Sequence, residues 1–233
     1  MITFPLSEGR WLKLVGRIDR LDLCRQDDSV FVKILDYKSG SNDLKEDLMR
    51  RGLQLQLIMY MNAVLKDLAA ANPGKEILPA AMLYYKITDA VLDGGSAVSD
   101  GSSQEEPAAE SPSEETLAGI RAALRPTGMV NDDPASYTLL DTSIAGKSDV
   151  IPLIAKNGKV TARGSHVFTT AGFEALSKEV NEVVCKLAEE ILDGNASAEP
   201  AVWDKDKEAC TYCPYKEVCG FDLSVDGYRY RDH

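Results

Sequence analysis

The sequence lacks the features of membrane and secreted proteins. Its 233 residues contain no run of about 18 uncharged apolar residues, so no membrane-spanning helix is predicted. The first residues, MITFP, lack the basic and apolar regions of a secretory signal, and five cysteines in a chain of this length do not indicate a disulfide-stabilised scaffold. No internal repeat is visible. We therefore expect a cytoplasmic protein whose hydrophobic residues, 44% of the total, form a substantial core.

Positive charge is scarce for a protein that would contact nucleic acid. The formal net charge is −11, from 26 Lys and Arg against 37 Asp and Glu. Residues 93–116 hold seven of the acids and no Lys or Arg, and consist mostly of small, polar and acidic residues without aromatics. This composition predicts a disordered insertion. The acidity outside the insertion is modest, and bound metals can neutralise a scissile phosphate, so the charge does not exclude a nuclease.

Apolar periodicity predicts an α/β fold. Strands are expected at residues 11–24, 30–38 and 78–88. Between the last two, apolar residues at spacings of three and four predict a helix that starts near Asp43, or near Leu53 if Gly52 breaks it, and ends at Ala71. This order indicates a mixed sheet with helices packed on it.

The second half of the chain adds helices, a hairpin and a tail. We expect a short helix from Glu115 to Leu124, a hairpin turn at Asn157-Gly158, and a long helix from Thr170 to Leu192 with Gly194 as its cap. The predicted organisation is therefore a core in two parts, 1–92 and 117–194, separated by the insertion at 93–116 and followed by a Cys-rich tail at 195–233.

Two carboxylates and a lysine stand at the ends of neighbouring predicted strands. Phosphodiester hydrolysis needs an activated water and stabilisation of negative charge, which magnesium supports, and magnesium prefers oxygen ligands. Asp19 and Asp36 are the candidate ligands, together with the backbone carbonyl of Tyr37. Asp36 and Lys38 are two apart on a strand, so their side chains share a face. Lys38 is then placed to orient the attacking water or to stabilise the transition state.

The predicted helix contributes two polar side chains on one face. Gln56 and Tyr60 are four residues apart and can reach the same site or a DNA backbone together.

Three cysteines crowd together near the end of the chain. Cys210, Cys213 and Cys219 form a C-x2-C-x5-C array that contains no histidine. Thiolates at this spacing are candidate metal ligands, and both zinc and iron–sulfur clusters accept them.

These motifs resemble a known family. GRID ending at Asp19, DYK ending at Lys38, and QLIMY from Gln56 to Tyr60 resemble the motif series of the PD-(D/E)XK nuclease superfamily, in its RecB-like branch. The resemblance implies a restriction-endonuclease-like mixed sheet flanked by helices. It also implies that Asp19 and Asp36 bind magnesium, that Lys38 is catalytic, and that Gln56 and Tyr60 lie near DNA. Several members also use a His or Glu on an earlier helix, and no such helix is predicted before residue 11.

With the cysteine tail, the likeness is to the iron–sulfur nuclease domains of the AddB family, which are subunits of bacterial helicase–nucleases. It implies a 4Fe–4S cluster on Cys210, Cys213 and Cys219, an AddA-like helicase–nuclease partner, and DNA single strands and duplex ends as ligands. That family takes its fourth cysteine from well before the nuclease strands. We expect that position in a longer parent chain from which this sequence was cut.

The expected function is that of a magnesium-dependent DNA exonuclease, acting on single strands from broken DNA ends in recombinational repair. CRISPR-associated adaptation exonucleases share the Q-x-x-x-Y element and a similar tail, although the hairpin and the insertion argue against them. A non-catalytic DNA-end-binding iron–sulfur module is the alternative outside enzymes.

Overall fold

The computed structural model describes residues 2–40, 43–87, 113–161, 166–204 and 207–231. It divides into two compact units, which are described separately below. The first, here called the sheet unit, comprises residues 16–44 and 56–175. The second, the tail unit, comprises residues 1–15, 45–55 and 176–233.

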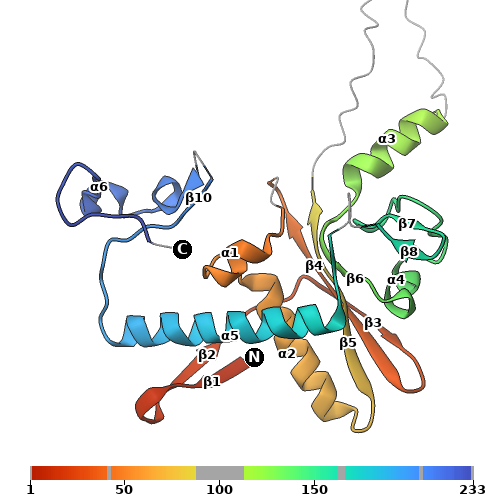
Figure 1. Ribbon diagram of the computed structural model, residues 1–233, viewed down its shortest axis with the longest axis horizontal. Helices are drawn as coiled ribbons and strands as arrows, with labels where there is room; N and C mark the ends of the chain where they lie inside the picture. Colours follow the sequence, from red (N-terminus) through yellow and green to blue (C-terminus); the bar gives the residue numbers. More distant parts are fainter. Residues whose placement is uncertain (1, 41–42, 88–112, 162–165, 205–206, 232–233) are drawn as a thin grey trace, which may run out of the picture. The chain divides into compact units, whose positions relative to one another are not determined.

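The sheet unit is built on a five-stranded sheet (Figure 1). In spatial order, its strands are β3 (Arg20–Arg25), β4 (Ser29–Lys38), β5 (Glu76–Lys86), β6 (Thr127–Asn131) and β9 (Val167–Phe168). The pairs β3–β4 and β5–β6 are antiparallel, whereas β4–β5 and β6–β9 are parallel. The mixed sheet predicted from the sequence is thus confirmed.

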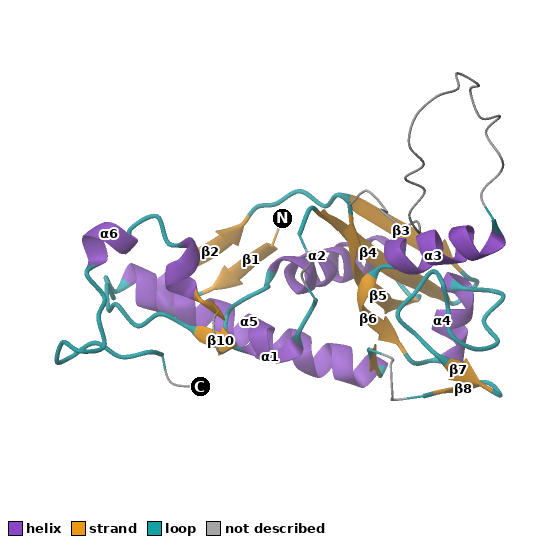
Figure 2. Cartoon of the chain, turned by 90° about the horizontal axis from the view of Figure 1, so that it is seen from above, coloured by secondary structure: helices purple, strands orange, loops and turns teal. Residues whose placement is uncertain are grey.

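Helices cover both faces of this sheet. Helix α2 (Gln56–Ala71) packs on β4 and β5 from one side, and α4 (Pro134–Leu140) packs on β5 and β6 from the other (Figure 2). Helix α3 (Glu114–Leu124) precedes β6 and is capped by the Ser113 side chain, which accepts a hydrogen bond from the Thr116 amide. The last residues of the predicted insertion are therefore helical, and residues 88–112 lie outside the described part.

Alternation along β4 divides its side chains between two cores. Leu35 joins Leu83, Val130 and Tyr137 in the cluster under α4. The neighbouring residues Ile34 and Asp36 project to the opposite face, where α2 packs. The sheet therefore presents Asp36 to the first turn of α2.

The predicted strand over 11–24 is wrong as a single element. Strand β2 (Trp11–Leu14) pairs with β1 (Ile2–Pro5) in a separate two-stranded sheet of the tail unit, and β3 starts only at Arg20. Residues 15–19 are irregular. The apolar alternation carried no mark of this break, since Val15 and Ile18 continue it although Val15 is exposed.

The first predicted helix is divided at Gly52, as the second of its two predicted starts required. Helix α1 (Glu46–Arg50) ends before Gly52, which has a φ of +81°, and α2 begins at Gln56 rather than at Leu53. A left-handed backbone there is open to glycine at little cost and interrupts the helix.

Two further predictions of local structure are confirmed. Strands β7 (Ala155–Lys156) and β8 (Lys159–Val160) form a hairpin whose turn residues, Asn157 and Gly158, both have positive φ, as a type I′ turn requires. Helix α5 spans Thr170–Leu192, and Gly194 follows it with a φ of +75°.

The tail unit contains α1, the β1–β2 hairpin with its 3-10 turn η1 (Ser7–Gly9), and most of α5. It also contains β10 (Val202–Asp204), β11 (Lys207–Glu208), the 3-10 turn η2 (Ala209–Tyr212) and the short helix α6 (Lys216–Cys219). Arg10 of the hairpin lies 2.5 Å from Glu189 of α5, which ties these elements together.

Among the described residues, none of the helices combines the length and the apolar character that crossing a bilayer requires.

Candidate active site

Asp36 is a buried carboxylate at the end of an apolar strand. Its side chain is part of a residue only 2% exposed. Gln56 Nε2 donates a hydrogen bond to Oδ1 at 2.8 Å, and Lys38 Nζ lies 2.6 Å from Oδ2 as an ion pair. Within the described residues, Oδ2 accepts no hydrogen bond of good geometry, so the ion pair is its only polar contact. A buried anionic oxygen in this state is suited to a cation.

Asp19 reaches the same point from the loop before β3. Its Oδ2 accepts a hydrogen bond from the backbone N–H of Tyr37 at 3.0 Å, which places the carboxylate beside the residue that follows Asp36. The Tyr37 ring meets Tyr85 edge to face at 5.8 Å, and by strand alternation it lies on the sheet face opposite Asp36. The Tyr37 carbonyl remains a predicted metal ligand.

Lys38, Gln56 and Tyr60 complete one polar network. Lys38 Nζ donates to Gln56 Oε1 at 3.0 Å, and Gln56 Nε2 lies 3.4 Å from the Tyr60 hydroxyl oxygen. Gln56 is the first residue of α2, so the helix start fixes where its amide projects. The structure therefore brings all six sequence-predicted site residues to one end of β4.

Gly16 makes room for this network. A Cβ atom at Gly16 would lie 2.6 Å from Tyr60 Cε1 and 2.8 Å from the Tyr60 hydroxyl. A side chain at this position would displace the tyrosine ring, which explains why glycine opens the GRID motif.

Tyr84 is a site residue that sequence reasoning missed. It pairs in register with Asp36 across the parallel β4–β5 ladder, and Lys38 Nζ lies 5.3 Å from the centre of its ring. Burial, and next the charge of Asp36, raises the pKa of Tyr84 to about 12. The phenol therefore stays neutral at ordinary pH. The register that reveals Tyr84 has no signal in a single sequence.

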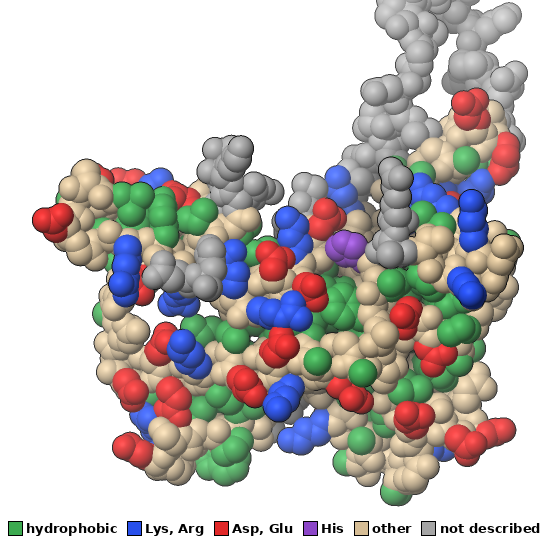
Figure 3. Space-filling model, in the orientation of Figure 1, with side chains coloured by type: hydrophobic (Ala, Val, Ile, Leu, Met, Phe, Trp, Pro, Cys, Tyr) green, Lys and Arg blue, Asp and Glu red, His purple; other side chains and the backbone are tan. Residues whose placement is uncertain are grey.

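A cavity of about 290 Å³ opens beside Lys38. Lys86 at the end of β5 and Arg125 after α3 line it together with Tyr84, and Asp43 is its acidic member. Arg125 Nη1 donates to the Ser148 carbonyl at 3.1 Å, which leaves its other N–H groups for a ligand. On the face seen in Figure 3, basic and acidic side chains are interspersed. Local basic groups such as these are therefore the natural contacts for a phosphate chain.

The two carboxylates fit a hard divalent cation. Among the described residues, no group of three or more His, Cys, Asp and Glu side chains is arranged to hold a metal ion. Magnesium, however, commonly takes one or two carboxylates and keeps several waters. The buried Oδ2 of Asp36 and the adjacent carboxylate of Asp19 match that donor set.

The cysteine array lies in the tail unit. Cys210 lies in η2, Cys213 follows it, and Cys219 ends α6, and all three line one cavity of about 300 Å³. Burial, followed by the Glu208 carboxylate and the two other thiols, raises the pKa of Cys210. The thiols share a cavity, yet in the described part of the tail they are not arranged as a metal site, so their predicted role as ligands stays a prediction.

The sheet and the site define the class of this protein. The family model of the PD-(D/E)XK nuclease superfamily matches residues 2–220, and the chain belongs to that superfamily. The mixed sheet with helices on both faces is accordingly its restriction-endonuclease-like fold, as predicted. Nucleases of this superfamily generally use a divalent metal ion.

Within the superfamily, the chain is similar to one particular subunit of the ATP-dependent helicase/deoxyribonucleases. It is 36% identical over 230 residues to this subunit from Clostridium botulinum, and the match covers 98% of the chain and 19% of that protein. The same subunit from Desulforudis audaxviator is 34% identical over 229 residues, which are 98% of the chain and 18% of that protein. The one from Clostridium kluyveri is 32% identical over 231 residues, which are 99% of the chain and 19% of that protein. The chain therefore spans about a fifth of the length of these relatives.

Proposed function

We propose that this chain is the DNA exonuclease domain of an AddAB-type helicase–nuclease, hydrolysing single strands from broken DNA ends during recombinational repair in the cytoplasm. One observation carries the proposal: Asp19, Asp36 and Lys38 converge at the end of β4 in a chain of the PD-(D/E)XK superfamily. The names of the relatives add a helicase–nuclease context, and hence an AddA-like partner subunit.

Asp19, Asp36 and the Tyr37 carbonyl would hold magnesium, which supplies a Lewis acid to neutralise charge on the scissile phosphate. Lys38 keeps its ammonium at this point through Gln56 Oε1 and the Asp36 carboxylate. From there it stabilises negative charge on the phosphate oxygens or orients the attacking water. Gln56 holds both charged groups, since its amide donates to Asp36 and accepts from Lys38.

The cavity with Lys86 and Arg125 would hold the strand next to the scissile phosphate. Its charged and polar lining suits phosphates and carries no means to identify a base sequence. We therefore propose that the domain grips the DNA backbone without sequence preference.

The proposal predicts metal-dependent degradation of single-stranded DNA by the full chain. End-labelled linear DNA should be shortened in the presence of magnesium and left intact with EDTA, and circular single strands should resist because an exonuclease needs an end. Gel analysis of timed samples measures this. DNA binding without any degradation would instead support the non-catalytic end-binding module, and rapid cutting of circles would contradict an exonuclease.

We also propose a 4Fe–4S cluster on Cys210, Cys213 and Cys219, because all three thiols line one cavity and thiolates are the usual ligands of such clusters. Four ligands are needed, and these cysteines provide three.

The full chain purified without oxygen should contain iron well in excess of zinc and should absorb visible light. Cys213→Ser should lose both properties, because it removes a ligand. Cys24→Ser is the matched control, since Cys24 lies in β3 of the sheet unit, and it should keep them. Elemental analysis showing zinc alone would contradict the cluster.

A further inference from the structure

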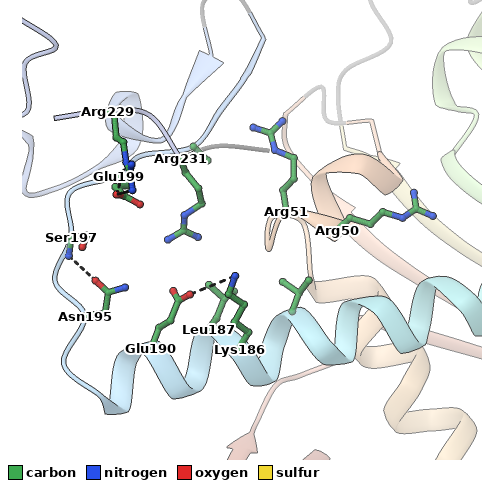
Figure 4. Close-up of a pocket in the computed structure, with 12 residues that line it drawn as sticks. Arg50, Arg51, Lys186, Leu187, Glu190, Asn195, Ser197, Glu199, Arg229 and Arg231 are labelled. Atoms are coloured by element: carbon green, nitrogen blue, oxygen red, sulfur yellow. Dashed lines mark hydrogen bonds and ion pairs between the residues drawn. The ribbon is translucent and has the colours of Figure 1, made fainter. Parts of the chain in front are cut away.

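The tail unit contains a cavity of about 350 Å³ with an unusual charge for this chain (Figure 4). Helix α1, the second half of α5 and the chain after it line the cavity. Its cationic side chains come from all three of these segments: Arg50, Arg51, Lys186, Arg229 and Arg231. Only two carboxylates, Glu190 and Glu199, belong to the lining. In a chain with a net charge of −11, a concave surface with this excess of cations favours an anionic ligand.

Some of these cations are already paired. Arg229 lies 2.8 Å from Glu199, and Arg50 lies 2.5 Å from Glu179. Lys186 is 4.0 Å from Glu190, at the limit of an ion pair. These pairs hold the walls of the cavity in place.

Arg231 is different. Among the described residues, its guanidinium has no carboxylate within ion-pair distance, while its backbone N–H donates to the Pro200 carbonyl at 3.1 Å. Figure 4 shows its side chain reaching across the cavity toward α5. Its neighbour across the cavity, Arg51, donates to the Val202 carbonyl, which positions a second guanidinium on the wall. Two arginines so placed can bind the oxygens of one phosphate.

The remaining lining narrows the ligand class. Asn195 Oδ1 accepts the Ser197 N–H at 3.0 Å, so the asparagine NH2 group and the serine hydroxyl remain as donors. Val183, Leu187 and Ala201 give aliphatic walls, and the described lining includes no aromatic ring on which a base could stack. The chemistry favours a phosphate over a nucleobase.

We propose that this cavity binds a backbone phosphate of single-stranded DNA and so gives the tail unit its own contact with the substrate. The inference rests on the proposed function, because that function makes DNA the anion this chain meets. A free nucleotide presents the same phosphate chemistry, so the experiment must separate the two sources.

The test is DNA binding by the full chain in EDTA, where no strand is cut. Anisotropy of a fluorescein-labelled oligothymidylate measures affinity across a series of salt concentrations. Arg231→Ala should lower the affinity about tenfold and reduce the salt slope by about one, as expected for one lost phosphate contact. Arg231→Lys should keep most of the affinity and Arg231→Glu should lose more than alanine.

Arg25→Ala is the matched control, because Arg25 is an exposed arginine at the far end of β3 from Asp19. It should bind DNA within about twofold of the unaltered chain. Equal affinities for Arg231→Ala and Arg25→Ala would overturn the inference, as would displacement of the oligonucleotide by thymidine monophosphate at lower concentration than by unlabelled strand. Circular dichroism shows whether each variant is folded, and if Arg231→Ala is not, the comparison of Arg231→Lys with Arg231→Glu decides.

The two proposals fail separately. Loss of binding in Arg231→Ala with no cleavage by the unaltered chain would leave the cavity assigned and remove the nuclease. Cleavage with binding independent of Arg231 would do the reverse.

Discussion

Asp36→Asn should abolish metal-dependent cleavage of single-stranded DNA, with a loss of about 1000-fold or more in rate at saturating DNA. The substitution preserves shape and can still accept the Gln56 hydrogen bond, but it removes the negative charge that both Lys38 and a divalent cation require. Because the residue is only 2% exposed, no solvent ion can replace that charge. Single-turnover measurements with end-labelled DNA give the rate of the chemical step.

The control for this variant is Asp27→Asn. Asp27 is an exposed carboxylate between β3 and β4, so the two variants change the net charge equally within the same hairpin. The control should cleave DNA at the original rate, and thermal melting should show both variants folded. Full activity in Asp36→Asn would exclude Asp36 from the metal site.

Gly128→Ala should destabilise the protein by at least about 3 kcal/mol, the largest effect on folding that we expect. Gly128 has a φ of +136°, which L side chains rarely adopt, in the strand that pairs with β5. An added Cβ would overlap the Met82 carbonyl oxygen and lie 3.0 Å from Leu83 Cα. These are backbone atoms of the central sheet, so no rotamer change relieves the contact.

Chemical denaturation followed by circular dichroism measures this loss. Gly40→Ala is the matched control, because a Cβ there meets nothing within 4 Å and Gly40 has no positive φ. It should unfold within about 0.5 kcal/mol of the unaltered chain. Equal stability of the two variants would show that β5 and β6 do not approach as closely as the structure has them.

The catalytic group was predictable because its signals are local. Asp36 and Lys38 share a face through strand alternation, and Gln56 and Tyr60 share one through helical spacing. Each pair needs only its own element to be assigned correctly, and the structure confirms both. The hairpin at Asn157-Gly158 was predictable for the same reason, since its two residues suffice to define the turn.

What the sequence could not supply depends on distant parts of the chain. Asp19 was expected on a strand, and instead lies in a loop held by the Tyr37 amide, a contact between residues 18 positions apart. Tyr84 joins the site through the register of a parallel pair, which many distant side-chain contacts decide together. The charged cavity of the tail unit is assembled from α1, α5 and the last residues, and no spacing in the sequence brings these together.

The central claim is that Asp19 and Asp36 jointly hold a divalent cation, and metal binding tests it without any reaction. Manganese, a paramagnetic substitute for magnesium, can be titrated into the full chain and followed by electron paramagnetic resonance, because bound and free ions give different signals. We predict one site of this kind that weakens sharply in both Asp19→Asn and Asp36→Asn and is unchanged in Asp27→Asn. Equal manganese affinity in all four proteins would contradict the account.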